Sequence, residues 1–320
     1  MHAFRTSRGT GGHAGRLGRN AQAEERAALL CLLPWLIGLL LFTGGPILAS
    51  LALSLTNWNL LTSPKFLGLD NYVEMATDWN FWQSVQVTLR YVVMSVPLYL
   101  VAGLGLALVL NLKIRGIGLF RTIFFLPSVL PGVATAVLFV TLLNPDLGVV
   151  NWFLRGIGIE HPPRWFLSPT WAVPSVVLVG LWGIGGGAII YLAGLQNINP
   201  QLYEAAAIDG AGPFRRFRDV TLPMLTPTLF FVLITSLIGA FQVFDIAFVL
   251  GGSRGGVGDS LLFYLINFWN EAFRNGRLGY GSALSWVLIV VAAIAILALF
   301  RTADRWVYYE IDPSKTGDAS

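Results

Sequence analysis

Six long apolar runs alternate with short polar segments along this chain. Each run is near the length that an α-helix needs to cross about 30 Å of hydrocarbon. Runs this long exclude a transmembrane β-barrel, whose strands are marked by short segments of alternating hydrophobicity. With 55% hydrophobic residues, 12% charged residues and a mean hydropathy of +0.67, the sequence predicts an all-α membrane protein with six spans. The runs cover residues 28–55, 85–112, 122–143, 171–196, 221–250 and 282–300.

The distribution of basic residues predicts the orientation in the membrane. If both termini are cytoplasmic, 14 of the 21 Lys and Arg residues lie on the cytoplasmic side and 7 on the outer side. Cytoplasmic loops carry such an excess, so the net charge of +4 reflects topology and does not imply nucleic-acid binding. Residues 1–27 are rich in Gly and Arg and are expected to form a disordered cytoplasmic tail. The run after them is too long for a signal peptide, and residues 302–320 are expected to form a second cytoplasmic tail.

The segment between the fourth and fifth runs, residues 197–221, is the longest polar island in the C-terminal half. Residues 204–208 are good helix formers, whereas Gly210 and Gly212 can adopt a positive φ and end a short helix. Pro213 is suited to the first position of a second helix. The segment therefore predicts a compact helix–turn–helix on the cytoplasmic side, where it can dock into a partner.

The amino-acid sequence of this segment resembles that of a known protein family. Leu-Tyr-Glu-Ala-Ala-Ala-Ile-Asp-Gly-Ala over residues 202–211 is similar to the coupling loop of permease subunits from ATP-binding-cassette (ABC) importers, and closest to the carbohydrate-uptake branch with its maltose and glycerol-3-phosphate permeases. Residues 66–72 and 241–245, with Gly251 and Gly252, resemble further segments of that branch. The resemblance spans roughly residues 29–301. It implies the six-transmembrane-helix type I ABC importer permease fold over residues 28–301, in the plasma (inner) membrane of a bacterium or archaeon.

The resemblance also implies partners. A second, different permease subunit, two ATPase subunits and an extracytoplasmic solute-binding protein would complete the importer, which would carry a sugar across the lipid bilayer. Glu204 would supply the charged contact to the ATPase, while Asp209 and Gly210 would fix the turn. The residues expected at this coupling site are Tyr203, Glu204, Ala205, Ala206, Asp209, Gly210, Gly212 and Pro213.

The third run contains prolines, which interrupt a helix, and the fourth contains glycines, which remove side chains from a helix surface. Pro127 and Pro131 remove backbone hydrogen bonds, and the freed carbonyls in a membrane must face protein or water. The third span is therefore expected inside the bundle or along a pathway. Gly183 and Gly187 have the spacing for close helix packing. Because glycine has no side chain, the same residues would equally widen a cavity for substrate. A dinucleotide-binding fingerprint in the same stretch lacks the preceding strand that it requires and is rejected.

The fifth run supplies polar candidates for contact with a solute. A carboxylate within an apolar span is costly and usually faces a cavity or a partner. Asp245 is therefore expected either to accept hydrogen bonds from sugar hydroxyls or to make a structural hydrogen bond or ion pair, and Gln242 is a second polar candidate. By resemblance to the family's sugar site, the other expected substrate-binding residues are Trp182, Gly183, Gly186, Ser236, Gly239, Ala240 and Val243.

The absence of certain motifs limits the chemistry expected of this chain. The sequence has no Gly-Lys-Ser/Thr phosphate loop and no zinc-binding spacing, and Cys31 is the single cysteine, so we expect no catalytic residue, no metal site and no bound cofactor in this chain. ATP and Mg²⁺ would bind the partner ATPase. Two alternatives stay open: an ion-coupled secondary transporter, for which Asp245 is the one fair intramembrane carboxylate, and an importer of glycerol-3-phosphate instead of a sugar.

Overall fold

The computed structural model describes residues 28–308, and the regular secondary structure within that range consists of helices, apart from one isolated bridge between Thr56 and Phe66. The tail expected over residues 1–27 lies outside the described residues, as does the end of the tail expected over 302–320. The first helix, Ala28–Ser54, contains the π-helical turn η1 (Leu40–Gly44) and α2 (Gly45–Ser54). The other main helices are α3 (Asp70–Thr77), α4 (Trp79–Leu110), α5 (Ile117–Val129), α6 (Gly132–Leu142), α7 (Val149–Gly156), α8 (Ala172–Leu181), α9 (Gly185–Asn197), α10 (Pro200–Ile208), α11 (Pro213–Arg216), α12 (Leu222–Phe241), α13 (Asp245–Gly251), α14 (Tyr264–Trp269) and α15 (Leu278–Ala303), with short turns η2 (Trp165–Leu167), η3 (Phe217–Thr221), η4 (Val257–Asp259) and η5 (Asn270–Arg274).

Within the described residues the helices provide up to six candidate spans, in agreement with the predicted number if two bent helix pairs are each counted as one span. Four stretches are single candidate spans: Ala28–Ser54, Trp79–Leu110, Pro213–Gly251 and Leu278–Ala303. The third span consists of α5 and α6, which meet at 98°, and the fourth consists of α8 and α9, which meet at 49°. The second span begins six residues before the predicted run, because Asp78 caps its first turn by accepting a hydrogen bond from the Asn80 N–H.

Pro131 causes the sharp bend in the third span. Leu130 and Pro131 are both extended, with ψ of 137° and 140°, because proline lacks an N–H and disfavours the helical conformation in the residue before it. Pro127, by contrast, lies inside α5 without ending it, so only the second of the two prolines breaks the helix. Within the single chain α5 has no buried residue, whereas Thr135 and Ala136 of α6 are buried, so only the second half of this span lies inside the chain's own bundle.

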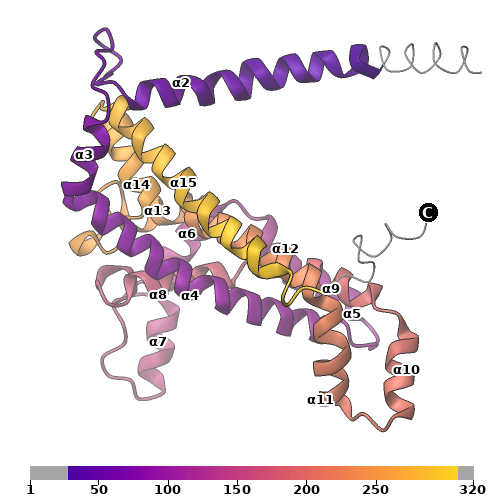
Figure 1. Ribbon diagram of the computed structural model, residues 1–320. Coiled ribbons are helices and arrows are strands. Elements are labelled where there is room, and N and C mark those ends of the chain that lie inside the picture. The colour runs from indigo at the N-terminus through magenta and orange to yellow at the C-terminus, as the bar shows by residue number, and fades with distance from the viewer. Residues whose placement is uncertain (1–27, 309–320) are drawn as a thin grey trace, which may run out of the picture.

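Helix α4 is the centre of the bundle and packs against α8, α9, α12 and α14. One buried cluster around Tyr91 and Phe263 joins α4 to α8 and the segment before α14, and a second, around Tyr191 and Leu225, joins α4 to α9 and α12. Figure 1 shows α3 and α14 at one end of the bundle and α10 and α11 at the opposite end. The first helix projects away from the other helices and contacts them mainly through α15, where the Trp286 indole N–H donates to the Ser50 hydroxyl at 3.2 Å.

Close packing of the fourth span depends on glycines other than the expected pair. A Cβ atom at Gly185 would overlap the Phe124 carbonyl group of α5, and one at Gly180 would overlap the Tyr99 hydroxyl of α4. Gly187 has nothing within 4 Å of its Cβ position, and that of Gly183, in the turn between α8 and α9, approaches only the Gly180 carbonyl, at 3.7 Å. Small residues do bring helices together here, but within the described chain the close contacts include those at Gly180 and Gly185, and neither Gly183 nor Gly187 packs against another helix.

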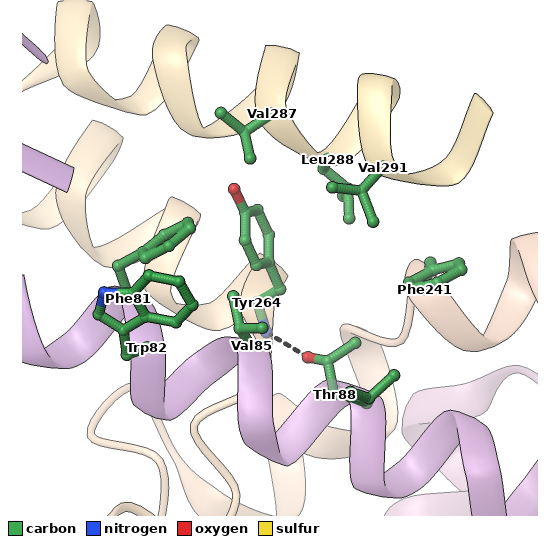
Figure 2. Close-up of a pocket in the computed structure, with 10 residues that line it drawn as sticks. Phe81, Trp82, Val85, Thr88, Phe241, Tyr264, Val287, Leu288 and Val291 are labelled. Atoms are coloured by element: carbon green, nitrogen blue, oxygen red, sulfur yellow. Dashed lines mark hydrogen bonds between the residues drawn. The ribbon is translucent and has the colours of Figure 1, made fainter. Parts of the chain in front are cut away.

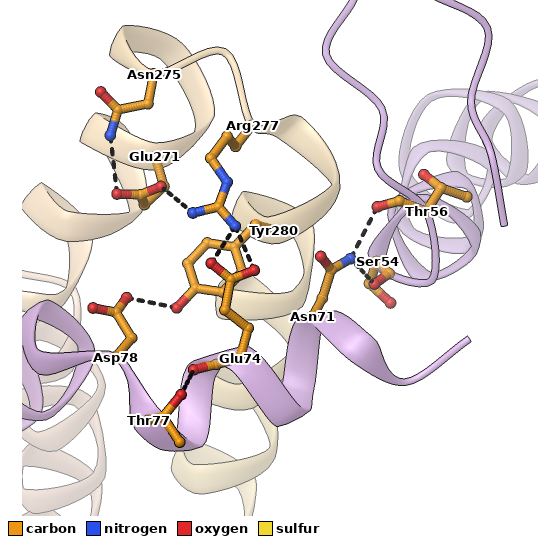
Figure 3. Close-up of polar contacts among 10 residues, drawn as sticks. All are labelled: Ser54, Thr56, Asn71, Glu74, Thr77, Asp78, Glu271, Asn275, Arg277 and Tyr280. Carbon is orange, nitrogen blue, oxygen red and sulfur yellow. Dashed lines mark hydrogen bonds and ion pairs between the residues drawn. The ribbon is translucent and has the colours of Figure 1, made fainter. Parts of the chain in front are cut away.

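An ion-pair network at the α3 end ties segments far apart in the sequence (Figure 3). The Arg277 guanidinium donates through Nη2 to both carboxylate oxygens of Glu74 at 2.6 Å and through Nη1 to Glu271 at 3.2 Å. The Tyr280 hydroxyl donates to Asp78 at 2.7 Å, and the guanidinium lies 4.4 Å from the centre of the Tyr280 ring. Because Glu271 is nearly buried, Arg277 is its neutralising partner at this end of the bundle.

We expect Arg277→Met to lower the free energy of unfolding by about 2 kcal/mol. This is less than the roughly 3–5 kcal/mol for breaking a fully buried ion pair, because Arg277 is 40% exposed and partly screened by solvent. Arg274→Met is the matched control, since Arg274 forms no ion pair within residues 28–308. Thermal unfolding of both purified variants checks the prediction, and equal midpoints for the two would contradict it.

Candidate transport cavity and coupling element

A cavity of about 290 Å³ lies where interrupted helices meet. Its walls come from α4, α6, α8 and the segment that joins α12 to α13. Within that segment Gln242 and Phe244 leave the helical conformation, with φ of −105° and −135°, before α13 begins at Asp245. We call it the α13 cavity, and it is lined by Tyr91, Gly132, Val176, Gln242, Val243, Phe244, Asp245 and Ile246.

The break in the third span lies against the break in the fifth. The Cβ position of Gly132, the residue after Pro131, is 3.6 Å from the Asp245 Cβ atom and 3.5 Å from the Ile246 side chain. At the break in the fourth span, the Trp182 ring packs edge-on against Phe139 of the same helix α6, with centroids 5.9 Å apart. Non-helical backbone at membrane depth is tolerated where it is buried in protein or lines a cavity, and transporter sites are typically built from such discontinuous helices.

Polar groups of the α13 cavity are available to a ligand. Gln242 and Asp245 are exposed to it, and neither side chain makes a hydrogen bond or ion pair with another residue of the described chain. The Tyr91 hydroxyl lies near that of Tyr99, at 3.4 Å. The cavity therefore offers a ligand the Asp245 carboxylate, which accepts hydrogen bonds, and the Gln242 amide, which both accepts and donates them.

A second cavity, also of about 290 Å³, lies between α4 and α15 (Figure 2) and has the opposite character. The Thr88 hydroxyl accepts from the Tyr264 N–H at 2.9 Å, and the Tyr264 hydroxyl donates to the Leu284 carbonyl at 2.8 Å. The Trp82 indole N–H donates to the Ala76 carbonyl at 2.9 Å. Because its polar atoms are already paired and its other walls are apolar, this cavity suits no polar solute, and the α13 cavity is the better candidate for transport.

The structure brings together only part of the predicted substrate site. Gln242, Val243 and Asp245 line the α13 cavity, whereas Ala240 is buried in the core cluster around Tyr91. The remaining candidates lie outside the cavity lining: Trp182, Gly183 and Gly186 at the α8–α9 break, and Ser236 and Gly239 on α12. Sequence reasoning missed Tyr91, Gly132, Val176, Phe244 and Ile246; of these only Gly132, directly after a helix-breaking proline, carried a signal.

The predicted helix–turn–helix is present as α10 and α11. Asn199 caps α10 by accepting from the Gln201 N–H at 3.0 Å, and Pro200 and Pro213 occupy first helical positions. Gly210 adopts φ +75°, and the Ala211 and Gly210 N–H groups donate to the Ala206 and Ala207 carbonyls at 2.8 and 3.1 Å. This pattern closes a helix end firmly. Gly212 has an ordinary φ of −69°, so Gly210 alone uses the conformational freedom of glycine.

Most of the predicted coupling residues lie on the surface of this element. Glu204, Ala205, Asp209, Gly210, Gly212 and Pro213 are exposed. Tyr203 is half-buried, and its hydroxyl lies 3.0 Å from the Thr221 hydroxyl, so it anchors α10 to η3. Ala206 is half-buried too.

Exposed apolar side chains on the element were not predicted. Ile208 is 87% exposed and Phe214 is 76% exposed, at the end of α10 and the start of α11. Beside them the Arg218 guanidinium donates to the Asp219 carboxylate at 2.7 Å. Figure 1 shows α10 and α11 projecting beyond the ends of α4 and α15. An apolar pair on a projecting, charged element is typical of a docking surface.

Comparisons with known proteins agree with this arrangement. Residues 99–315 match the family described as binding-protein-dependent transport system inner membrane component. The chain is 40% identical to the probable ABC transporter permease YesP of Bacillus subtilis, over 94% of this chain and 98% of that protein. It is 35% identical to the trehalose/maltose transport permease MalF of Thermococcus litoralis, over 87% and 95% of the two chains, and 39% identical to the lactose transport permease LacF of Rhizobium radiobacter, over 81% and 88%.

A solved structure shares the fold. The chain superimposes on a chain of a bacterial ABC transporter involved in the import of the acidic polysaccharide alginate, with a TM-score of 0.77, 26% identity and coverage of 91% of this chain and 99% of that one. The described helices, the family match and the relatives agree. This chain therefore belongs to the family of binding-protein-dependent transport system inner membrane components and is a permease of the ABC transporter class.

Proposed function

We propose that this permease forms, with a second permease subunit, the pathway through which an ABC importer takes up a sugar or oligosaccharide. An extracytoplasmic binding protein delivers the sugar, and one of the two ATPase subunits of the importer docks on α10 and α11 of this chain. The relatives that carry trehalose, maltose and lactose support a carbohydrate substrate, and the availability of Gln242 and Asp245 for hydrogen bonds supports the α13 cavity as its site.

One observation carries the mechanism: the coupling element and the cavity are joined by one helical body. Residues 213–241 are helical without interruption through α11, η3 and α12, about 43 Å at 1.5 Å per residue. The body starts at the turn that carries Gly210 and ends at Gln242 in the cavity wall. A displacement of the coupling element by the ATPase therefore reaches the cavity directly.

The coupling element is built to move as a unit. The capped ends of α10, the Tyr203–Thr221 contact and the Arg216 guanidinium, which donates to the Ala211 carbonyl at 2.8 Å, hold α10 against η3. Closure of the ATPase subunits on ATP would push this element, tilt α12 and turn the α13 cavity from the cytoplasmic to the outer side. ATP and Mg²⁺ act on the partner subunits, and this chain contributes no catalytic group.

Uptake by the complete complex tests the proposal. The permease, its partner permease, the ATPase and the binding protein are reconstituted in liposomes with labelled maltose, trehalose or lactose outside and ATP inside. We expect accumulation of unaltered sugar that requires both ATP and the binding protein. Uptake that continues without ATP and follows an ion gradient would contradict the proposal and make Asp245 a candidate for ion coupling.

A further inference from the structure

We infer that the α13 cavity selects uncharged sugars over acidic ones, and that Asp245 sets this preference. The inference rests on the proposed function, because it concerns the solute that crosses at the same site. It assigns a substrate class, neutral hydroxyl-rich sugars, and it disfavours uronate-containing sugars and glycerol-3-phosphate.

The charge balance of the cavity is the first observation. Asp245 is the one carboxylate among the eight lining residues, and no Lys, Arg or His is among them. None of the four ion pairs found between residues 28 and 308 involves Asp245. Asp245 therefore has no ion-pair partner among residues 28–308.

The nearest basic residue along α4 faces elsewhere. Arg90 directly precedes Tyr91, but it lines a separate hollow with Gln86, Leu89, Val93 and Met94. Tyr91, by contrast, contributes to the α13 cavity. Successive residues of a helix point about 100° apart, so the Arg90 side chain faces away from the α13 cavity and does not offset the charge of Asp245.

The chemistry of the two sugar classes then differs sharply. A sugar hydroxyl can donate a charge-assisted hydrogen bond to the Asp245 carboxylate. A substrate carboxylate or phosphate at the same place meets a like charge in a medium that screens far less than water, which penalises its binding. Because a related fold serves an importer of acidic alginate, the fold itself does not impose this preference, and the side chains of the cavity must.

The test compares matched pairs of sugars on the assembled complex. Maltose, trehalose and lactose are each paired with the derivative in which one primary alcohol is oxidised to a carboxylate. Binding of each form to the complex in nanodiscs, without the binding protein, is measured by equilibrium dialysis for the wild type, Asp245→Asn and the control Asp146→Asn. Asp146 is an exposed loop carboxylate outside the cavity lining.

The prediction concerns whichever of the three sugars the complex takes up, together with its oxidised derivative. We expect the wild type and Asp146→Asn to bind this neutral sugar more than about tenfold more tightly than its acid. Asp245→Asn should reduce that ratio to about threefold or less, mainly by tighter binding of the acid, because Asn keeps an acceptor but loses the charge. Equal affinity of the wild type for both forms, an unchanged ratio in Asp245→Asn, or no binding of a sugar that is nevertheless taken up would overturn the inference. Loss of ATP-driven uptake for every sugar would instead count against the proposed function.

Discussion

Gly185→Ala will weaken or prevent folding of the permease, although it adds a single methyl group. The new Cβ atom would overlap the Phe124 carbonyl, which is backbone and cannot rotate away as a side chain would. Helices α5 and α9 must then separate, and the cost falls at the upper end of the range for overpacking, about 3 kcal/mol. Thermal unfolding of the purified permease complex measures the loss.

Gly187→Ala is the matched control for this prediction. It lies two residues further along α9, and its Cβ position meets no atom within 4 Å. Because alanine also favours the helix more than glycine does, this variant should change stability by less than about 1 kcal/mol. Similar unfolding midpoints for the two variants would show that α5 and α9 do not pack as described.

Ile208→Ser combined with Phe214→Ser will detach the permease from its ATPase. Both side chains are exposed here, so the change leaves the fold of the chain intact. Burying two such side chains at an interface contributes about 3–5 kcal/mol, and their removal should therefore weaken assembly by roughly a hundredfold or more. Co-purification of the ATPase with the variant permease, at several ATPase concentrations, measures the affinity.

A control for the apolar pair is available on the same element. Ala207→Ser changes an exposed residue next to Ile208 without removing a large apolar side chain, and we expect its ATPase affinity to stay within about threefold of the wild type. Unchanged assembly in the Ile208 and Phe214 variant would place the docking surface elsewhere on the chain.

Sequence reasoning predicted the features that depend on local chemistry. The spans follow from run length, the bend follows from Pro131, and the helix–turn–helix follows from the residues between Asn199 and Pro213. Each of these is determined by the backbone preferences of a few neighbouring residues or by the thickness of the bilayer.

Features that depend on contacts between distant segments were not predictable from the sequence. Gly185 and Gly187 look alike in the sequence, and only the approach of α5 separates their roles. Arg277 meets Glu74 across 203 positions, and Tyr91 reaches the α13 cavity because α4 packs against α8. Ala240 was assigned to the substrate site by resemblance, yet in this chain it is buried in the core.

Glu204→Ala provides the most direct test of coupling between the ATPase and the cavity. Glu204 is exposed on α10, and alanine preserves the helix, so any effect must arise from contact with a partner. Loss of a hydrogen bond to a charged group, about 1.5–3 kcal/mol, should lower ATP-driven sugar uptake in proteoliposomes roughly ten- to hundredfold. Gln201→Ala, an exposed residue one turn earlier, should leave uptake close to that of the wild type. Wild-type uptake by the Glu204 variant would contradict the coupling role of this element.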